Sequence, residues 1–476
     1  MIKLTMNELH YEYDIRGLLM AFYPGREIEC VISDVPYGDE FELQVNYLPD
    51  AIAVSLNENK ERLNLNWEDH EAKNELKRCV YRMLSKAENG KTLPWGTLTG
   101  IRPVKIPMSL LEQGKSEEEI LKSLSQTYYI SEEKAKLSTK IAHTELNLLN
   151  KLDYENGYSL YIGIPFCPTT CLYCSFTSYP FSRFESKIWD YLHALEKEIR
   201  YTAKKFKDKK LNSIYFGGGT PTTLLPDQLD WLLGLVTDQF DLTNCLEWTV
   251  EGGRPDSITA EKLQVIRKYP VDRISINPQT MKQETLDIIG RRHTVEQVKS
   301  AYHMAREEGF NNINMDLILG LPEENVDDVR HTMEELEILA PDNLTVHTLA
   351  LKRASRLNTQ KDQYSHLHFE RNTAQMMQVT MDYAKKMGLE PYYLYRQKNM
   401  SGNLENIGYA KPGLEGVYNI LIMEEKQSIQ ALGAGAVTKR VDLDGKINRA
   451  SNVKDIDQYL ARVDEMIERK EKLWEE

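Results

Sequence analysis

Three of the six cysteines, Cys167, Cys171 and Cys174, lie together in the run IPFCPTTCLYCSF. Their C-x3-C-x2-C spacing lets three thiolates wrap one face of a cubic iron–sulfur cluster. No fourth cysteine lies nearby in the sequence. A cluster with three protein ligands keeps one iron open to an external molecule, which is typical of a reactive cluster rather than of one that only transfers electrons.

A structural zinc site with a fourth ligand from elsewhere is the alternative for these cysteines. The spacing differs from the paired C-x2-C of zinc ribbons, and the sequence has no second pair. Tyr173, beside the third cysteine, could shield a cluster and stack on an adenine. We therefore favour the cluster, and we interpret Cys30, Cys79 and Cys245 as buried free thiols.

Polar and glycine-rich groups follow several strand-like runs downstream. The turn Gly217-Gly218-Gly219-Thr220-Pro221 would let a ligand approach the backbone closely, although a plain tight turn explains it as well. Further along, the chain offers two carboxylates, an amide and a guanidinium, on Glu251, Asp316, Gln279 and Arg291. This set suits a ligand with ribose hydroxyls, an ammonium and a carboxylate.

Each of these polar residues could alone be a surface or ion-pair residue. Asp316 differs, because it interrupts the apolar run NINMDLILGLP and a buried charge needs a partner. For His293 we favour a structural role over binding of a substrate carboxylate. No Ser/His/Asp arrangement, P-loop or H-E-x-x-H motif is visible, and no general acid or base is assigned.

The elements that must position these groups alternate between strand and helix. Strand-like runs are expected at 158–164, 213–216, 248–251, 273–277, 314–319 and 344–349, and helices at 184–206, 226–239, 259–268, 282–290, 294–309 and 325–339. Such alternation predicts a parallel sheet, and six repeats indicate a partial TIM-like (β/α)6 barrel, with a doubly wound sheet as the alternative. The polar groups fall at the C-terminal ends of the strands, where β/α folds carry their active sites.

A chain of 476 residues is too long for one compact core. We expect an N-terminal α+β domain of unknown role at 1–150, the barrel at 151–351 and a C-terminal α+β extension at 352–476. The first should hold strands at 27–34, 41–48 and 51–56, a helix at 67–87 and helices from about 116 and 131. The last should hold a Met-rich helix at 366–387, a loop at 392–416, a strand at 417–423, a tight turn at 432–436 and a final amphipathic helix.

The composition of the chain limits the classes of molecule with which the protein is expected to associate. The formal charge of −13 argues against non-specific nucleic-acid binding. No apolar run approaches the roughly 20 residues of a membrane span, and the N-terminus lacks the apolar core of a signal peptide. The expectation is a cytoplasmic protein, and we expect a monomer.

The pattern Y-I-x-I-P-F-C-x3-C-x2-C followed by GGGTP resembles the radical S-adenosylmethionine (SAM) enzymes of the oxygen-independent coproporphyrinogen III dehydrogenase family. The resemblance covers residues 158–351, and the additional N-terminal domain is similar to that of the family's HemZ-type branch. In that family the open iron of a [4Fe–4S] cluster chelates SAM. Reductive cleavage then gives a 5′-deoxyadenosyl radical that abstracts hydrogen from the substrate.

The resemblance implies specific roles for the motif residues. Cys167, Cys171 and Cys174 would hold the cluster, and Tyr161, Gly218 and Glu251 would contact the cluster-bound SAM. A second SAM would be lined by Tyr173, Gly219, Thr220, Gln279, Arg291, Asp316 and Ala350. A tetrapyrrole substrate and an electron donor such as flavodoxin or ferredoxin are implied as partners.

The implied reaction is oxidative decarboxylation of coproporphyrinogen III to protoporphyrinogen IX in anaerobic heme biosynthesis. The alternatives are a heme-binding chaperone on the same scaffold and another radical reaction on a tetrapyrrole, such as methyl transfer with heme ring opening. Three positions depart from relatives' patterns. Gly163 replaces a His, Phe176 replaces a further Cys, and the segment 416–419 lacks the His and Trp of the chaperones' H-N-x-x-Y-W.

Overall fold

The computed structural model describes residues 1–33, 35, 41–69, 71–352, 354–369, 372–397 and 404–475. The chain forms two compact units. The first contains Met1–His143 and Leu394–Glu405, and the second contains Thr144–Tyr393 and Asn406–Glu476. The functional boundaries expected at residues 150 and 351 stay predictions.

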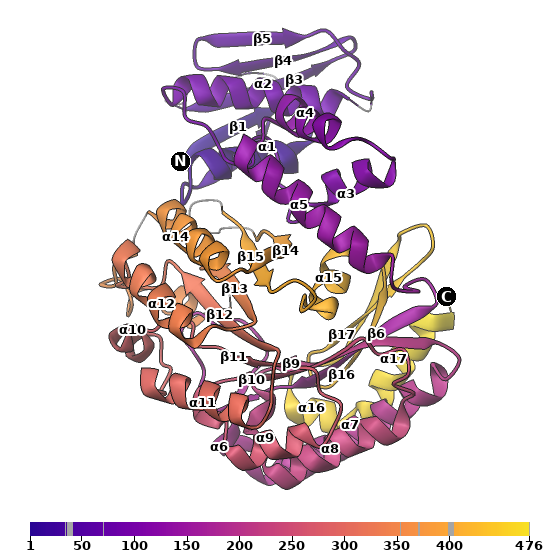
Figure 1. The fold of residues 1–476 in the computed structure, drawn as a ribbon. Coiled ribbons are helices and arrows are strands. Elements are labelled where there is room, and N and C mark those ends of the chain that lie inside the picture. The colour runs from indigo at the N-terminus through magenta and orange to yellow at the C-terminus, as the bar shows by residue number, and fades with distance from the viewer. Residues whose placement is uncertain are drawn as a thin grey trace. The chain divides into compact units, whose positions relative to one another are not determined.

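The first unit is a five-stranded sheet with helices (Figure 1), in the strand order β2-β1-β3-β4-β5. Its strands are β1 (Ile2–Met6), β2 (Ile28–Ile32), β3 (Glu42–Leu48), β4 (Ala51–Leu56) and β5 (Asn59–Leu63). Its helices are α1 (Glu12–Phe22), α2 (Ala72–Ala87), α3 (Lys105–Glu112), α4 (Glu117–Tyr128) and the greater part of α5 (Glu132–Leu149). The expected strands and helices of this region are confirmed, although residues 34 and 70 lie outside the described part.

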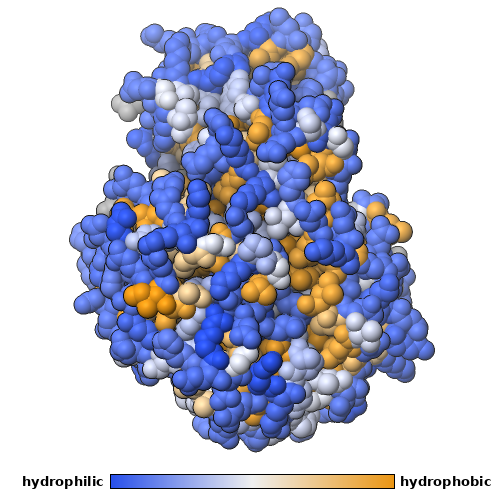
Figure 2. All heavy atoms as spheres, viewed as in Figure 1, coloured by the Kyte–Doolittle hydropathy of each residue, from blue (hydrophilic) through white to orange (hydrophobic). Residues whose placement is uncertain are grey.

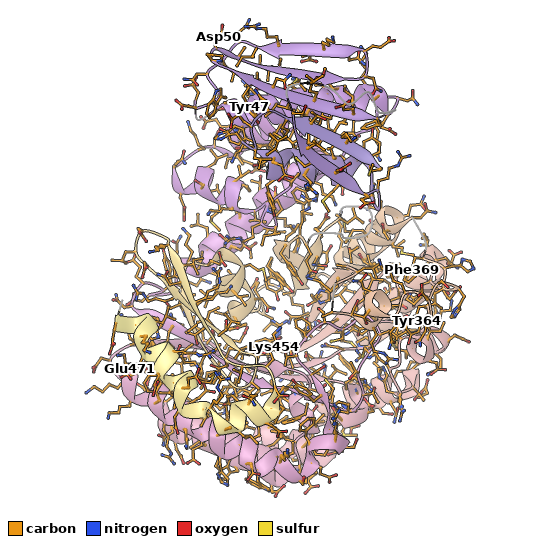
Figure 3. All side chains as sticks on the ribbon, turned by 180° about the vertical axis from the view of Figure 1, so that it is seen from behind. Tyr47, Asp50, Tyr364, Phe369, Lys454 and Glu471 are labelled. Atoms are coloured by element: carbon orange, nitrogen blue, oxygen red, sulfur yellow. The ribbon has the colours of Figure 1, made fainter. Side chains whose placement is uncertain are left out.

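Local sequence explains these elements. Ser116 caps α4 in a reciprocal capping box with Glu119, which is the helix-start pattern that the sequence predicts. β3 and β4 form an antiparallel hairpin whose turn carries Asp50, and Tyr47 lies on β3 (Figure 3). Alternating buried side chains of the hairpin join those of α1 and α2 in one apolar core.

Residues far apart in sequence meet inside the first unit. The Glu405 carboxylate accepts a 2.7 Å hydrogen bond from Trp95 Nε1 and pairs with Lys134 Nζ at 2.7 Å. Trp95, Lys134 and Glu405 are all buried. A buried carboxylate with two such partners ties Glu405 into this unit.

The second unit is built on an eleven-stranded sheet in the order β14-β15-β13-β12-β11-β10-β9-β6-β16-β17-β18. Its six central strands are parallel: β6 (Gly157–Ile164), β9 (Lys210–Gly218), β10 (Glu247–Gly253), β11 (Arg273–Ile276), β12 (Ile313–Leu319) and β13 (Asn343–Thr348). The connecting helices are α7 (Ile188–Lys205), α8 (Pro226–Gln239), α9 (Ala260–Arg267), α10 (Gln283–Ile288), α11 (Val295–Glu307) and α12 (Val326–Leu339). They cover the outer face of the curved sheet (Figure 1), so the partial (β/α)6 barrel is confirmed.

The C-terminal segments extend both edges of this sheet. β15 (Asn406–Ala410) pairs antiparallel with β13, and β14 (Glu390–Tyr395) follows it at the edge. At the other edge β16 (Ser428–Leu432) runs parallel to β6, and β17 (Val437–Val441) and β18 (Ile447–Ser451) complete the sheet. The helices of these segments include α13 (Arg356–Thr359), α14 (Thr373–Lys386), α16 (Ile456–Ala461) and α17 (Val463–Glu475), whereas the short α6 (Phe181–Phe184) precedes α7 in the barrel. α17, on which Figure 3 labels Glu471, packs against α7 and β18.

Two expected elements are wrong. The segment 417–423 forms a helix, α15 (Val417–Glu424), rather than a strand. Its run VYNILIM is almost wholly apolar, and such a run fits a buried helix as well as a buried strand.

The expected loop at 392–416 contains the end of β14 and all of β15, because β15 pairs with β13, and residues 398–403 lie outside the described part. The helix expected at 366–387 is observed as α14, and residues 370 and 371 lie outside the described part. The tight turn at 432–436 is confirmed, since Gly433 and Gly435 have positive φ of 100° and 74°.

The surface is mainly hydrophilic in the view of Figure 2, where hydrophobic residues form small separate patches. Among the described residues, no helix is both long and apolar enough to cross a membrane.

Candidate functional site

The three clustered cysteines lie on a loop that leaves the C-terminal end of β6. The two-residue strands β7 (Phe166–Cys167) and β8 (Tyr179–Pro180) pair with each other and close the loop at its base. Leu172, between the second and third cysteines, donates its N–H to Ile289 O at 2.9 Å and accepts from Leu357 N at 3.1 Å. The loop is therefore fixed from both sides although it has little regular structure.

Hydrogen-bond donors surround the thiols. Thr220 Oγ1 lies 3.4 Å from Cys167 Sγ, and Arg254 Nη1 lies 3.9 Å from Cys171 Sγ. Burial raises the pKa of Cys167 to about 11, and burial also raises the pKa of Cys174. Buried thiols with a hydroxyl and a guanidinium beside them are well suited to thiolate ligation, because these donors stabilise the negative charge that ligation requires.

The donor set bears on the two interpretations of the cysteines. Cys167, Cys171 and Cys174 are three free thiols on one loop. Three thiolates are the protein ligands of a [4Fe–4S] cluster that keeps one iron open, whereas a structural zinc ion takes four protein ligands. The three thiols therefore fit a cluster.

The glycine turn lies directly beside this loop. Thr220 N–H donates to Phe166 O at 2.7 Å, and Gly219 N–H donates to Ile164 O at 2.8 Å. A Cβ atom on Gly219 would lie 2.5 Å from Phe166 O, and Gly218 has a φ of 108°. Both glycines are therefore required by the backbone, one for close approach and one for its conformation.

The strand register directs one set of side chains to a common face of the sheet. Tyr161 pairs with Tyr215, Glu251 with Ser275, and Asp316 with Thr345. Paired residues of parallel strands point to the same side, so these side chains line the inner face of the barrel, because helices cover the outer face.

Burial along the strands shows that this inner face is mostly buried and keeps a few partly exposed positions. Three strands each have one position that is not buried. This position is Tyr161 in β6, Asp316 in β12 and His347 in β13. Tyr215 and Glu251 retain exposed area in the same way within otherwise buried stretches of β9 and β10. Since the register puts these positions on the inner face, the barrel encloses an accessible polar lumen, which we define by these five residues.

Tyr161, Tyr215 and Tyr418 of α15 form a cluster of three aromatic rings in the lumen. The centroids of Tyr215 and Tyr418 are 4.5 Å apart, and that of Tyr161 lies 6.3 Å from each. The Tyr215 hydroxyl donates to Glu251 Oε1. Burial raises the pKa of Glu251 to about 7, opposed by the Tyr215 hydrogen bond and assisted by the charge of Asp316.

Asp316 lies on the same inner face as Glu251, with β11 between their strands. Asn314 Nδ2 donates to its Oδ1 at 2.7 Å, and His347 Nε2 lies 3.8 Å from its Oδ2. Burial alone would raise the pKa of Asp316, but His347 and Asn314 hold it below the usual range. The partner that a charge in this apolar strand requires is thus supplied by the next strand.

Several polar groups near Asp316 have no partner within the described chain. Gln279, at a φ of 69°, bridges to β12 through its N–H and C=O, while its buried side-chain Oε1 has no hydrogen bond. The same holds for the buried Ser275 Oγ and Asn277 Oδ1. Unsatisfied buried acceptors are costly, so this side of the lumen is suited to a ligand with hydroxyl or amine donors.

Arg291 connects the cysteine loop with two strand ends. Its guanidinium donates to Tyr173 OH at 3.0 Å, to Gly253 O at 3.2 Å and to Asn277 O at 2.7 Å. Only 4% of Arg291 is exposed. The two terminal nitrogens of the guanidinium are thus hydrogen-bonded within the protein, and one of them holds Tyr173 beside the cysteines.

His293 is fully buried. Burial and the charges of Arg291 and Arg254 lower its pKa to about 3, so its imidazole is neutral. A neutral imidazole away from solvent does not bind a carboxylate as a cation, which agrees with the structural role that we favour.

The remaining predicted residues fall around the same rim. Tyr173 packs on the apolar cluster of Leu286, Ile289, Ile318, Leu321 and Leu349, and Ala350 follows that cluster directly after β13. The predicted site residues other than Arg291 therefore lie on the cysteine loop, on the inner face of the barrel strands or just beyond their C-terminal ends. Arg291 lies between α10 and α11 and reaches the ends of β10 and β11 through its guanidinium. Their roles as ligands stay predictions.

Sequence reasoning missed four residues of this site: Arg254, Tyr215, His347 and Tyr418. Arg254 forms a two-point ion pair with Asp256 and also reaches Thr169 Oγ1 at 2.9 Å. Its position three residues after Glu251 was the available signal. Tyr215 and His347 look like ordinary strand residues until the register is known.

Comparison with known proteins agrees with this geometry. The family model "Radical SAM superfamily" matches residues 161–336. The oxygen-independent coproporphyrinogen-III oxidase-like protein HemZ of Bacillus subtilis is 46% identical over 402 residues, which are 83% of this chain and 80% of HemZ. The heme chaperone HemW of the same organism is 31% identical over 280 residues, 58% of this chain and 70% of HemW.

A solved structure shares the fold. Coproporphyrinogen III oxidase HemN from Escherichia coli, described as a radical SAM enzyme, superposes with a TM-score of 0.54 at 24% sequence identity. The match covers 68% of this chain and 72% of HemN. With the 46% identity to HemZ over most of both chains, the family is established. The chain belongs to the radical SAM superfamily, in the family that includes the coproporphyrinogen-III oxidase-like protein HemZ and the heme chaperone HemW.

Proposed function

We propose that the protein catalyses the oxidative decarboxylation of two propionate groups of coproporphyrinogen III to vinyl groups, giving protoporphyrinogen IX. The observation that carries the proposal is the accessible polar lumen with the three-cysteine loop at its rim. A reaction that abstracts hydrogen from an unactivated carbon needs such an enclosed site, because water and stray donors must be kept away from the radical. The 46% identity to the coproporphyrinogen-III oxidase-like HemZ supports the choice of substrate.

Membership of the radical SAM superfamily implies a [4Fe–4S] cluster and SAM. We assign the cluster to Cys167, Cys171 and Cys174. We assign one SAM to Tyr161, Gly218 and Glu251, and a second to Tyr173, Gly219, Thr220, Gln279, Arg291, Asp316 and Ala350. When bound, these groups supply the one-electron chemistry that removes a hydrogen atom from the substrate.

The chain's own residues orient and enclose these groups. Thr220 and Arg254 stabilise thiolate charge at Cys167 and Cys171. Gln279 Oε1 and Asn277 Oδ1 are free acceptors for ribose hydroxyls or an ammonium group. Glu251 and Asp316 offer carboxylates to the same donors from one face of the sheet.

We also propose the compartment, the oligomeric state and the electron donor of the reaction. The six cysteines are free thiols, as expected in the reducing cytoplasm. We propose a cytoplasmic monomer that receives electrons from flavodoxin or ferredoxin.

The test is an anaerobic assay of purified, cluster-reconstituted protein with coproporphyrinogen III, SAM and a reductant. The expected product is protoporphyrinogen IX, identified by mass spectrometry, with one SAM cleaved per vinyl group. SAM cleavage without a vinyl product would contradict the proposed reaction. A methylated or ring-opened tetrapyrrole would instead identify another radical reaction of the same machinery.

A heme chaperone is the second candidate, favoured by the 31% identity to HemW. In the segment 416–419, Tyr418 is buried and stacked on Tyr215, and this segment has no His to bind heme iron. Titration with heme distinguishes the two candidates. A chaperone would bind heme tightly and convert no coproporphyrinogen, whereas the proposed enzyme would show turnover.

A further inference from the structure

The Glu251 carboxylate is held by one neighbouring tyrosine. The Tyr215 hydroxyl donates to its Oε1, and within the described part of the chain this is the one hydrogen bond that the carboxylate accepts. Tyr215 lies on β9 and Glu251 on the adjacent β10, each at a partly exposed position of the inner face. Oε1 is therefore fixed by the protein, while Oε2 stays available to a ligand.

The glycine turn makes room for this pair. A Cβ atom on Gly217 would lie 2.8 Å from Cε1 of Tyr215 and 3.1 Å from Oε2 of Glu251. The tyrosine ring and the carboxylate oxygen thus occupy the space that a side chain at residue 217 would fill. A larger residue there would displace one of them, so the absence of a side chain at Gly217 is part of how Glu251 is placed.

The next glycine of the turn brings Tyr161 to the same point. A Cβ atom on Gly218 would lie 3.3 Å from the Tyr161 hydroxyl oxygen. Consecutive glycines therefore lie against Glu251 Oε2 and against the Tyr161 hydroxyl. The three residues that we assign to one SAM, Tyr161, Gly218 and Glu251, meet beside this turn.

The Tyr215 ring is itself held from α15. Tyr418 stacks on it with a centroid distance of 4.5 Å and an interplanar angle of 21°. Glu247, at the start of β10, accepts from the N–H groups of Val417 at 2.7 Å and Tyr418 at 3.3 Å, which fixes the start of α15. A ring packed in this way has little freedom to turn, so its hydroxyl keeps one direction.

We propose that Tyr215 is a positioning residue that holds the Glu251 carboxylate beside the glycine turn, ionised and directed at the cluster-bound SAM. The inference rests on the proposed function for the assignment of this SAM to Tyr161, Gly218 and Glu251. An ionised carboxylate suits this ligand, because SAM carries an ammonium group and ribose hydroxyls, and charged acceptors form the stronger hydrogen bonds. In this role Tyr215 acts through Glu251 and touches no reacting atom.

The protonation state of Glu251 depends on Tyr215. Burial raises the pKa of Glu251 to about 7, and the hydrogen bond from Tyr215 opposes this rise. The other groups that face this carboxyl are a second carboxylate, a guanidinium and two tyrosine hydroxyls, on Asp316, Arg273, Tyr161 and Tyr418. In Tyr215→Phe these groups stay while the hydrogen bond is lost, so the pKa of Glu251 rises further and less of it is ionised near neutral pH.

The experiment measures equilibrium binding of SAM to the cluster-reconstituted full chain without oxygen, at pH 6.5 and at pH 8.5. Tyr215→Phe keeps the stacked ring and removes the hydroxyl. Tyr269→Phe is the matched control, because the Tyr269 hydroxyl donates to the Asp230 carboxylate at 2.9 Å on the outer helical layer of the barrel. Infrared spectroscopy of the apoprotein follows the carboxyl band that Glu251→Gln lacks, so it reports the titration of Glu251 in the absence of SAM.

We expect the midpoint of the Glu251 titration to rise by about one pH unit in Tyr215→Phe, as for the loss of one hydrogen bond to a charged group. SAM binding by this variant should then be about tenfold weaker than that of the wild type at pH 6.5. At pH 8.5 the difference should be less than about twofold, because Glu251 is largely ionised in both proteins. Tyr269→Phe should match the wild type in both measurements.

Equal SAM affinity of Tyr215→Phe and the wild type at both pH values, or an unchanged midpoint of the carboxyl band, would overturn the inference. So would an equal loss of affinity at both pH values, because that result would indicate a general disturbance of the lumen. If the wild type bound SAM with this pH dependence but converted no coproporphyrinogen, the proposed reaction would fail and the role of Tyr215 would stand. If the wild type bound no SAM, both the SAM assignment and this inference would fail.

Discussion

Arg291 offers the sharpest test of how the cysteine loop is held. Three hydrogen bonds from one buried guanidinium join Tyr173 to the ends of β10 and β11, at Gly253 and Asn277. In Arg291→Lys a single ammonium can reach one or two of these acceptors, because it lacks the planar fork. The acceptors left behind are partly buried.

The magnitude follows from the lost bonds. A hydrogen bond from a charged donor contributes about 1.5–3 kcal/mol. Loss of one or two of them should lower the free energy of unfolding of the second unit by about 3 kcal/mol. The cysteine loop should also loosen, so iron bound per chain after reconstitution should fall.

Calorimetry of the apoprotein and iron analysis of the reconstituted protein measure the two effects. Arg292→Lys is the control, since Arg292 is exposed and adjacent. If Arg291→Lys had the same stability and the same iron content as the wild type, this reasoning would be refuted. Wild-type stability with weakened SAM binding would show that Arg291 acts on the ligand rather than on the loop.

Three further predictions follow from the site. Cys167→Ala should abolish the brown absorbance near 400 nm of the reconstituted protein, whereas Cys245→Ala should retain it, since Cys245 lies outside the loop; equal spectra would contradict the cluster assignment. Gly219→Ala should lower iron content, because its Cβ would meet Phe166 O at 2.5 Å and displace the strand that carries the first cysteine; full occupancy would mean that the backbone can yield. The pKa of Glu251 is about 7 in the folded protein and about 4.3 in an unfolded chain, so between these values only the folded state keeps the proton and stability falls as pH rises. Glu251→Gln should remove this decline, which amounts to at most about 4 kcal/mol. Urea unfolding at pH 5 and pH 8 measures it, and an equal change in stability of Glu251→Gln and the wild type between these pH values would contradict the reasoning.

Much of the barrel could be predicted from sequence because its elements carry strong local signals. The helix expected at 226–239 matches α8 (Pro226–Gln239), which begins with Pro at its first position. The strands expected at 158–164 and 314–319 match β6 and β12 within one residue at each end. Short apolar runs between amphipathic helices leave little choice of structure.

The rest depended on long-range pairing that local patterns do not contain. The apolar segment 417–423 is a helix because Glu247 accepts from the N–H groups of Val417 and Tyr418 at its start. β16 pairs with β6 across some 270 residues of sequence, and no local pattern specifies such a partner.

The residues of the candidate site also fall into two groups: those that the local sequence predicts and those that only the fold brings together. The cysteines and the glycine turn are contiguous, so their spacing alone indicates their chemistry. The lumen is different, because Tyr215 and His347 are single polar positions in apolar strands. Only the register shows that they share a face with Glu251 and Asp316.

The most direct test of the proposed reaction follows the hydrogen atom that leaves the substrate. Coproporphyrinogen III deuterated at the propionate methylene that is attached to the pyrrole ring, β to the carboxylate, is incubated with the reconstituted protein, SAM and a reductant without oxygen. If the proposed reaction takes place, we expect protoporphyrinogen IX together with 5′-deoxyadenosine that carries one deuterium per molecule. Unlabelled 5′-deoxyadenosine, or labelled 5′-deoxyadenosine without any vinyl product, would contradict it.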